Sequence, residues 1–366
     1  MSLNSKPDII IVGAGLSGLC CAALIHEGGK KVLLLEAGEI TGGRILSVME
    51  QHTGKFVADL GPSWIWPDHQ SIIARWLAKL GLKTLPQYSD GKAILDYGPD
   101  QPVQTGFIPT QDGNEYVRGG SRALIDKLVD RLPAETIMTG TQVKTIDTTG
   151  NGISVLTKNP TFPVLEAEQV IVALPARIAA TCIDWQPGLP GGLSDGLLST
   201  PTWMAPHAKV AIIYDQAFWR EQGLSGRIAS RAGPIVECHD HCGQEGSPAA
   251  LWGFIGWPPH VRAELGETLK EHIRTQLKRC FGEQNPDPMA IHVEDWATNP
   301  FVTTPQDLID PINHPDVGPD VLRNFYFDNR ICFAGSETAE RSPGLIEGAF
   351  DAAERAVHTI QHHNSR

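Results

Sequence analysis

The feature that most constrains this chain is a glycine-rich turn between two short apolar runs near its N-terminus. The run Ile9–Val12 is followed by a GxGxxG sequence at residues 13–18, and the run Val32–Leu35 comes after it. Continuous apolar runs of this length are typical of strands buried on both faces of a parallel sheet. Residues 19–26 between them are small and apolar, as in a helix packed closely on a sheet. This order predicts an α/β fold with a Rossmann-type dinucleotide site.

Each glycine of the turn has a separate role in such a site. Gly13 permits the tight turn, Gly15 lets the backbone approach a pyrophosphate, and Gly18 lets helix and strand pack closely. The first N–H groups of the helix would face the phosphates. Glu36, which stands 18 residues after Gly18, can accept a hydrogen bond from a ribose hydroxyl. The neighbours expected to border the dinucleotide with them are Ala14, Leu16, Ser17 and Ala37.

Composition narrows the class of protein. The 366 residues carry 30 Lys and Arg against 42 Asp and Glu, a formal net charge of −12. This charge disfavours binding to nucleic acid or to an anionic membrane surface, and no apolar run approaches the roughly 18 residues of a spanning helix. The seven cysteines follow no disulfide framework, and the N-terminus has no apolar secretory core. We therefore expect an acidic, cytoplasmic enzyme.

The segment after Glu36 distinguishes between dinucleotides, because Glu36 itself suits the ribose of either NAD or FAD. It contains Gly42-Gly43-Arg44, and residues 58–65 read Ala-Asp-Leu-Gly-Pro-Ser-Trp-Ile. Both stretches resemble segments of the flavin-containing amine oxidase superfamily, which includes the monoamine and polyamine oxidases. The resemblance implies that the diglycine passes close to the FAD pyrophosphate and that Arg44 offsets its charge. The residues placed under the isoalloxazine ring would be Gly61, Pro62, Ser63 and Trp64.

The C-terminal part of the chain resembles the same superfamily. Residues 330–338 form an apolar run that breaks at Gly335, and residues 342–350 open a helix. In the superfamily the end of this strand holds the pyrophosphate and ribityl chain, and the positive end of the helix dipole faces the flavin. No cysteine stands where some relatives attach flavin, so the resemblance implies non-covalent FAD. The further FAD-binding residues assigned on this ground are Val143, Trp296, Gly335, Ser336, Glu337, Gly344, Leu345 and Ile346.

We predict two domains. A discontinuous Rossmann-type FAD-binding domain comprises residues 1–80, 114–185 and 322–366, and a smaller α+β substrate domain comprises residues 81–113 and 186–321. The first insertion, 81–113, is irregular in pattern and has only 33 residues, much fewer than in the larger superfamily members. Much of the usual cavity wall would be missing. We therefore expect either a more open site or closure by a second subunit in a homodimer.

The resemblance assigns catalytic roles to two residues. Lys209, which opens an apolar run, matches the lysine that holds a water against flavin N5, and residues 218–220 follow at the family's spacing. A cation near N5 would stabilise negative charge as oxygen accepts electrons. Trp296 matches a tryptophan packed beside the flavin. The alternatives are a solvated lysine at a strand end and an ordinary core tryptophan.

The chain departs from the superfamily where two aromatic rings usually flank the substrate. Residues 302–305 read Val-Thr-Thr-Pro where the first ring should occur, and Leu345 stands at the second position. The aromatic cage is therefore absent from both expected places, and Trp64 and Trp66 are candidates to supply aromatic surface instead. Gly38 also replaces a basic residue that is common after the ribose-binding acid, which predicts weaker cofactor affinity.

Flavin amine oxidation leaves the difficult electron transfer to the cofactor, so the protein must mainly bind, orient and exclude water. The leading prediction is an FAD-dependent oxidoreductase that oxidises a primary or secondary amine to an imine. Its small-molecule partners would be the amine and dioxygen, with hydrogen peroxide as coproduct. One alternative is dehydrogenation or desaturation of a non-amine substrate, which the missing cage favours. Another is a catalytically silent flavoprotein, which the short insertion favours weakly.

Residues 238–242 read Cys-His-Asp-His-Cys and contain residue types that bind metals. Zinc sites usually combine two separated pairs of ligands, and no second pair stands at a suitable spacing. We therefore predict a polar hairpin loop at this position and no metal site.

Overall fold

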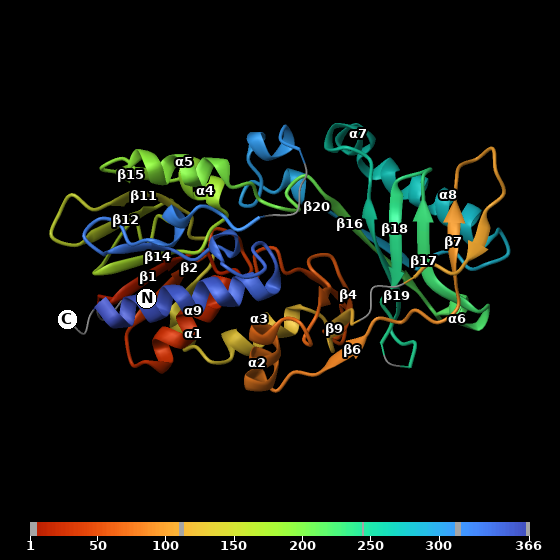
Figure 1. Ribbon diagram of the computed structural model, residues 1–366, viewed down its shortest axis with the longest axis horizontal. Coiled ribbons are helices and arrows are strands. Elements are labelled where there is room, and N and C mark those ends of the chain that lie inside the picture. The colour runs from red at the N-terminus through yellow and green to blue at the C-terminus, as the bar shows by residue number, and fades with distance from the viewer. Residues whose placement is uncertain (1–5, 110–112, 244, 312–315, 364–366) are drawn as a thin grey trace.

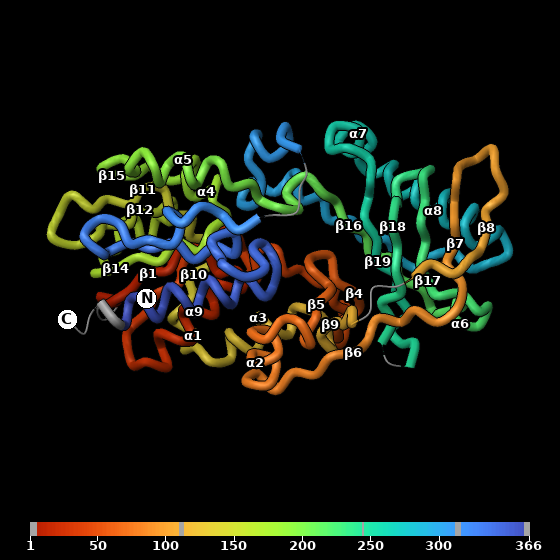
Figure 2. Tube along the Cα trace, viewed as in Figure 1, coloured from red at the N-terminus to blue at the C-terminus, as the bar shows by residue number. Residues whose placement is uncertain are grey.

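The computed structural model describes residues 6–109, 113–243, 245–311 and 316–363. Two sheets dominate it and lie at opposite ends of the molecule (Figure 1). Shorter strands and helices connect the two ends, and both described ends of the chain lie at the same end of the molecule (Figure 2). Among the described residues, no helix is both long enough and apolar enough to cross a membrane.

A five-stranded parallel sheet forms one end. Its strands, in spatial order, are β10 (Ile137–Met138), β2 (Val32–Leu35), β1 (Ile9–Val12), β14 (Gln169–Val172) and β21 (Ile331–Phe333). All four residues of β1 and of β2 are buried, as their uninterrupted apolar sequences predict for strands covered on both faces. The predicted Rossmann-type unit is confirmed, because β1 and β2 pair in parallel.

Each face of this sheet has its own cover. On one face lie α1 (Leu16–Glu27), α3 (Arg122–Val129) and α9 (Ile346–His363), which share an apolar core with α2 (Ser71–Leu80). The other face is covered by a four-stranded sheet and two short helices. These elements are β13 (Val164–Ala167), β12 (Ile153–Thr157), β11 (Val143–Asp147), β15 (Asp184–Gln186), α4 (Ala176–Thr181) and α5 (Gly191–Ser199).

The other end of the molecule is a seven-stranded sheet. Its strands, in spatial order, are β20 (Ala290–Asp295), β16 (Ala208–Tyr214), β19 (Ala249–Ile255), β18 (Ile235–Asp240), β17 (Leu224–Ser230), β7 (Lys92–Asp96) and β8 (Gln104–Gly106). Its apolar core includes α8 (Leu269–Phe281) and α6 (Phe218–Glu221), and α7 (Pro259–Leu265) precedes α8. Helix α8 buries Leu269, Ile273 and Leu277, which recur every four residues and therefore share one face.

Two expectations about this end are wrong. The insertion 81–113 is not irregular throughout, because β7 and β8 add two strands to the sheet, and Ala93 and Ile94 are buried there. Residues 238–242 are not a polar hairpin loop, since Cys238 to Asp240 belong to β18 and all five residues are buried. The described residues hold no group of three or more potential ligands that could bind a metal ion.

Small sheets between the two ends complete the fold. Strands β3 (Ser47–Met49) and β4 (Phe56–Asp59) form one pair, and β5 (Trp64–Ile65), β9 (Glu115–Val117) and β6 (Thr84–Pro86) form another sheet. Every strand of the seven-stranded sheet falls within the predicted substrate segments. Strand β6 and helix α5, however, pack with the predicted cofactor segments. The domain boundaries stay a prediction.

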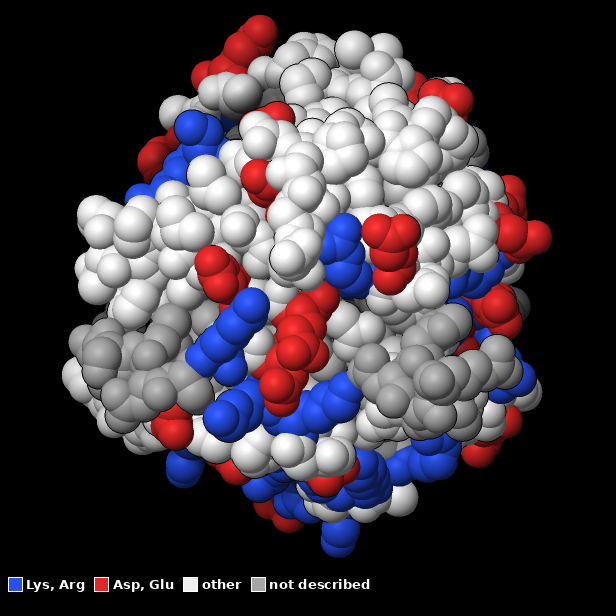
Figure 3. Space-filling view, turned by 90° about the vertical axis from the view of Figure 1, so that its left-hand side faces the viewer, with Lys and Arg blue, Asp and Glu red and all other residues white. Residues whose placement is uncertain are grey.

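The outer face of the parallel-sheet end carries mixed charge. Lys and Arg stand among Asp and Glu side chains on its lower half, and its upper half is largely uncharged (Figure 3). The described residues on this face form no continuous basic patch of the kind that binds a phosphate backbone.

Candidate active site

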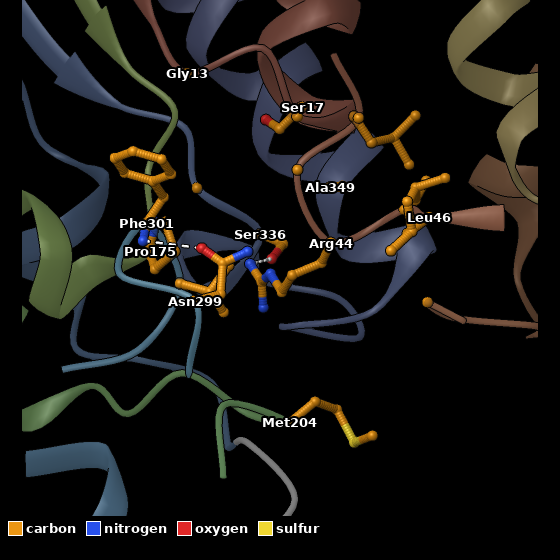
Figure 4. Close-up of a pocket in the computed structure, with 18 of the residues that line it drawn as sticks. Gly13, Ser17, Arg44, Leu46, Pro175, Met204, Asn299, Phe301, Ser336 and Ala349 are labelled. Atoms are coloured by element: carbon orange, nitrogen blue, oxygen red, sulfur yellow. Dashed lines mark hydrogen bonds between the residues drawn. The ribbon is translucent and has the colours of Figure 1, made fainter. Parts of the chain in front are cut away.

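A cavity of about 500 Å³ lies between the two ends of the molecule. One wall is formed where strands of the parallel sheet end, because Gly13, Glu36, Ala173 and Gly335 follow β1, β2, β14 and β21 in turn. Ligands of open α/β sheets bind at this carboxyl edge. The opposite wall includes side chains of β16, β19 and β20. Figure 4 shows Gly13 and Ser17 on the side of the parallel sheet and Met204 across the cavity.

Gly13 and Gly18 determine the shape of the glycine-rich turn. Gly13 has φ +101°, a left-handed conformation that side chains other than glycine rarely adopt. A Cβ on Gly18 would lie 1.9 Å from the carbonyl oxygen of Gly13, so only glycine lets the helix sit this close to the strand. Ala14 and Gly18 lie behind the cavity wall, whereas Gly13, Gly15, Leu16 and Ser17 line it.

The wall at Gly15 has the form that a pyrophosphate needs. Gly15 and Gly42 pair as an isolated bridge, and a Cβ on Gly43 would lie 3.2 Å from the Cα of Gly15. Gly15 is also the N-cap of α1, and its first turn has no side-chain cap. The N–H groups of that turn therefore remain available to a bound anion. This glycine cradle fits the phosphates of a dinucleotide.

Replacing Gly15 by Leu is expected to weaken FAD binding at least about tenfold, because the side chain would occupy the space that backbone leaves for the pyrophosphate. The fold should survive, since the nearest atom to a Cβ there is 3.9 Å away. FAD titration followed by flavin fluorescence measures the dissociation constant. Gly192→Leu, at an open helix position with nothing within 4 Å of the Cβ, is the matched control. Equal FAD affinity in the two variants would place the pyrophosphate elsewhere.

Glu36 is held by backbone at the end of β2. Its carboxylate accepts hydrogen bonds from the N–H groups of Ala14 and Gly38, each at 2.8 Å. Burial raises the pKa of Glu36, and these two hydrogen bonds oppose the rise. The carboxylate lines the cavity beside Ala37, where its remaining lone pairs can accept a ribose hydroxyl.

Arg44 has protein partners in this structure. Its guanidinium donates to Glu337 at 2.6 Å and to Ser336 at 2.9 Å, so it joins the N-terminal and C-terminal segments. Figure 4 shows the bond to Ser336. Arg44 and Ser336 line the cavity, whereas Glu337 is buried behind them. Glu337 thus acts on the cavity through Arg44, whose positive charge it partly compensates.

Lys209 lines the cavity with its ammonium group buried. It donates to the carbonyl oxygen of Gly61 at 2.5 Å and to the hydroxyl of Ser63 at 2.6 Å. Its Nζ stands 4.1 Å from the ring centroid of Trp252, a cation–π contact. Burial lowers the pKa of Lys209 to about 7, although Asp59 favours the charged form. The interpretation as a solvated lysine at a strand end is therefore wrong.

Trp296 begins the short 3₁₀ helix η3 (Trp296–Thr298) and lines the cavity near Lys209. Its indole Nε1 donates to the carbonyl oxygen of Leu60 at 3.3 Å, in the segment that also receives Lys209. The segment from Leu60 to Trp64 thus receives hydrogen bonds from Lys209 of β16 and from Trp296, which directly follows β20. The other predicted residues of the cavity wall are Gly42, Gly43, Gly61, Pro62, Ser63, Trp64, Val143, Gly344, Leu345 and Ile346.

A buried contact between a carboxylate and a histidine supports this segment from behind. The carboxylate of Asp59 contacts His241 Nε2 at 3.1 Å, and neither side chain is exposed. Asp59 also accepts hydrogen bonds from Ser47 and from the backbone and hydroxyl of Ser121. Burial would raise the pKa of Asp59, but its interactions with His241 and Lys209 outweigh burial and lower it. The pair therefore fixes the strand that leads directly into Gly61 and Ser63.

Aromatic side chains line part of the cavity, although not at the two usual cage positions. Val302 and Leu345 border the cavity where the cage rings were expected. Trp64 and Trp66 also line it, as the sequence suggested, and Trp64 packs edge-on against Trp252 with centroids 4.8 Å apart. The cavity residues that sequence reasoning missed include Trp203, Met204, Trp252, Phe254, Glu294, Asn299 and Phe301. The alternation of Trp252 and Phe254 along one strand was the available signal.

Comparison with known proteins identifies the class. Residues 100–361 match the family model of flavin containing amine oxidoreductases, and residues 11–80 match that of an NAD(P)-binding Rossmann-like domain. The chain therefore belongs to the flavin-containing amine oxidoreductase family. It is an FAD-dependent enzyme of amine oxidation.

Individual relatives cover nearly all of the chain. Amine oxidase [flavin-containing] B of Sus scrofa is 26% identical, over 98% of this chain and 87% of the relative. The alignment spans 465 positions against 366 residues here, so about 100 positions lack a counterpart. Cyclohexylamine oxidase from Brevibacterium oxydans IH-35A superposes with a TM-score of 0.81 at 18% identity, over 99% of this chain and all of that one. A putrescine oxidase triple mutant superposes with a TM-score of 0.78 at 19% identity, over 98% and 99%.

Proposed function

We propose that the cavity binds FAD non-covalently and that Lys209 marks the end where the amine reacts. FAD, when bound, would supply the redox chemistry: the amine loses its Cα hydrogen and one N–H proton with two electrons to become an imine, and dioxygen gains two electrons and two protons to give hydrogen peroxide. The glycine cradle and Glu36 would hold the dinucleotide, and residues 61–64 would support the flavin ring. The observation that carries the proposal is the buried ammonium of Lys209, held at Gly61 and Ser63 inside an otherwise largely apolar cavity wall.

Lys209 would act as a fixed positive charge. Negative charge forms on oxygen as it accepts electrons, and a desolvated cation stabilises such charge more strongly than one in water. The hydrogen bonds to Gly61 and Ser63 fix the position of Nζ before any ligand enters. Trp296 would hold the same segment through Leu60, so its role is to position it.

The aromatic wall would bind the carbon skeleton of the amine. Trp64, Trp252 and Phe254 present ring surface next to Lys209, and Val302 and Leu345 add aliphatic surface. Apolar burial of the skeleton, together with exclusion of water, would orient the nitrogen without a dedicated cage. We therefore propose primary or secondary amines with an apolar carbon chain as substrates.

The test is an anaerobic visible spectrum of the FAD-loaded protein before and after addition of a panel of primary and secondary amines. Bleaching of the flavin band by at least one amine, followed by return of the band and formation of hydrogen peroxide on admission of air, is expected. A flavin band that no amine bleaches, but that dithionite does bleach, would overturn amine oxidation by this chain.

We also propose that the enzyme works in the cytoplasm. All seven cysteines are free thiols, as expected in a reducing compartment. The closing second subunit expected from the short insertion stays a prediction.

A further inference from the structure

One carboxylate in the cavity wall has no hydrogen-bond or ion-pair partner among the residues that the structure describes. Glu36 and Glu294 are the carboxylates that line the cavity. Glu36 accepts two backbone hydrogen bonds. Glu294, in contrast, makes no hydrogen bond or ion pair with any residue that the structure describes. Its carboxylate is therefore left to bind something that enters the cavity.

The position of Glu294 sets it beside the reactive end. It lies near the end of edge strand β20, directly opposite Lys209 in the antiparallel pairing with β16. Directly paired residues point to the same face of a sheet, and both line the cavity. The ammonium of Lys209 is nevertheless turned to Gly61, Ser63 and Trp252. It does not neutralise Glu294.

Other charges nearby do not neutralise Glu294 either. Its neighbour Asp295 is held by Arg262 through two hydrogen bonds, at 2.7 and 2.6 Å. Arg44, the other cation that lines the cavity, donates its hydrogen bonds to Glu337 and Ser336. Burial raises the pKa of Glu294, and Asp295 raises it further. A half-buried carboxylate left in this state costs free energy that a bound cation would offset.

We propose that Glu294 binds a second ammonium group of the substrate, so that the enzyme prefers diamines to monoamines of equal chain length. This inference rests on the proposed amine oxidation. The nitrogen that is oxidised must be neutral, because it gives up electrons from its lone pair. A carboxylate favours the ammonium form and therefore suits a different nitrogen of the same molecule. The aromatic wall would cover the carbon chain between the two.

Kinetics with a matched substrate pair tests the preference. We expect kcat/KM of the wild-type enzyme to be at least about tenfold higher for 1,6-diaminohexane than for hexylamine. Glu294→Gln should raise KM for the diamine about tenfold and change the constants for hexylamine less than about twofold. Glu283→Gln, which alters an exposed carboxylate outside the cavity, should change neither. Equal kcat/KM for both amines, unaffected by Glu294→Gln, would overturn the inference.

A binding measurement separates this inference from the proposed function. Hexamethonium carries two quaternary nitrogens without lone pairs, so it can bind but cannot be oxidised. Calorimetry should give wild-type protein a dissociation constant about tenfold lower than that of Glu294→Gln, with no such difference for hexyltrimethylammonium. The same affinity in both proteins would refute the role of Glu294. Failure of every amine to bleach the flavin would instead refute amine oxidation and leave this binding result to stand by itself.

Discussion

Lys209→Met is expected to slow the reoxidation of reduced FAD by dioxygen about 100-fold, which is the usual effect of removing one preorganised electrostatic group. Met fills similar space without a charge, so FAD should stay bound. Stopped-flow mixing of the reduced enzyme with oxygenated buffer measures the rate. Lys270→Met, which removes a partly buried lysine that pairs with Glu267 outside the cavity, should leave the rate unchanged. A wild-type rate in Lys209→Met would remove this residue from the oxygen reaction.

The pH dependence follows from the same buried group. Because the pKa of Lys209 is lowered to about 7, its ammonium form predominates below that pH and its neutral form above it. The wild-type rate of reoxidation should therefore fall as the pH rises through about 7. In Lys209→Met the rate of reoxidation should not change as the pH passes through about 7. If the lysine were merely structural, the variant would keep the same pH dependence as the wild type.

Asp59→Ala is expected to lower the free energy of unfolding by about 3 kcal/mol, because it leaves several buried hydrogen-bonding groups without their partner. It leaves His241 buried without a carboxylate, and it deprives Ser47 and Ser121 of their acceptor. Urea unfolding followed by circular dichroism measures the difference. Asp147→Ala removes an exposed carboxylate that accepts hydrogen bonds from Thr149, and it should leave the free energy of unfolding nearly unchanged.

The stability at low pH should also show the interactions of Asp59. The pKa of Asp59 is lower in the folded chain than in the unfolded chain, so its stabilising effect is complete above the ordinary pKa of about 3.9 and is lost as the pH falls through the folded value. Wild-type stability should therefore fall more steeply below pH 4 than that of Asp59→Ala. If the stabilities of the two proteins fell equally with pH, the partners of Asp59 would not lower its pKa.

The parts of the fold that the sequence predicts are those with a strong local pattern. Uninterrupted apolar runs mark β1 and β2, and the glycine spacing that fits them is local as well. Strand β7 escaped prediction because its five residues are flanked by turn-forming residues and it pairs with β17, more than 100 positions later in the chain. Its burial depends on a partner that no short window contains.

The residues of the candidate site likewise fall into those that a local motif predicts and those that only long-range pairing brings to the cavity. The cavity wall formed by the fingerprint and the C-terminal signature was expected from sequence, because motif order fixes it. The pair of Asp59 and His241 spans 182 positions, and His241 belongs to a stretch that resembled a polar loop. Glu294 shows no pattern at all, since one carboxylate near a strand end is usually solvated. Only the cross-strand register with Lys209 places it at the cavity.

The bonds between the two ends of the chain bear on when the enzyme acquires its cofactor during synthesis. The hydroxyl of Ser17, in the first turn of α1, donates to Ala334, and Arg44 is held by Glu337 and Ser336. A growing chain on the ribosome has the glycine turn long before it contains Ala334, Ser336 and Glu337, because Ser17 and Ala334 are 317 positions apart. A nascent chain that still lacks these residues should therefore hold FAD more weakly than one that already contains them.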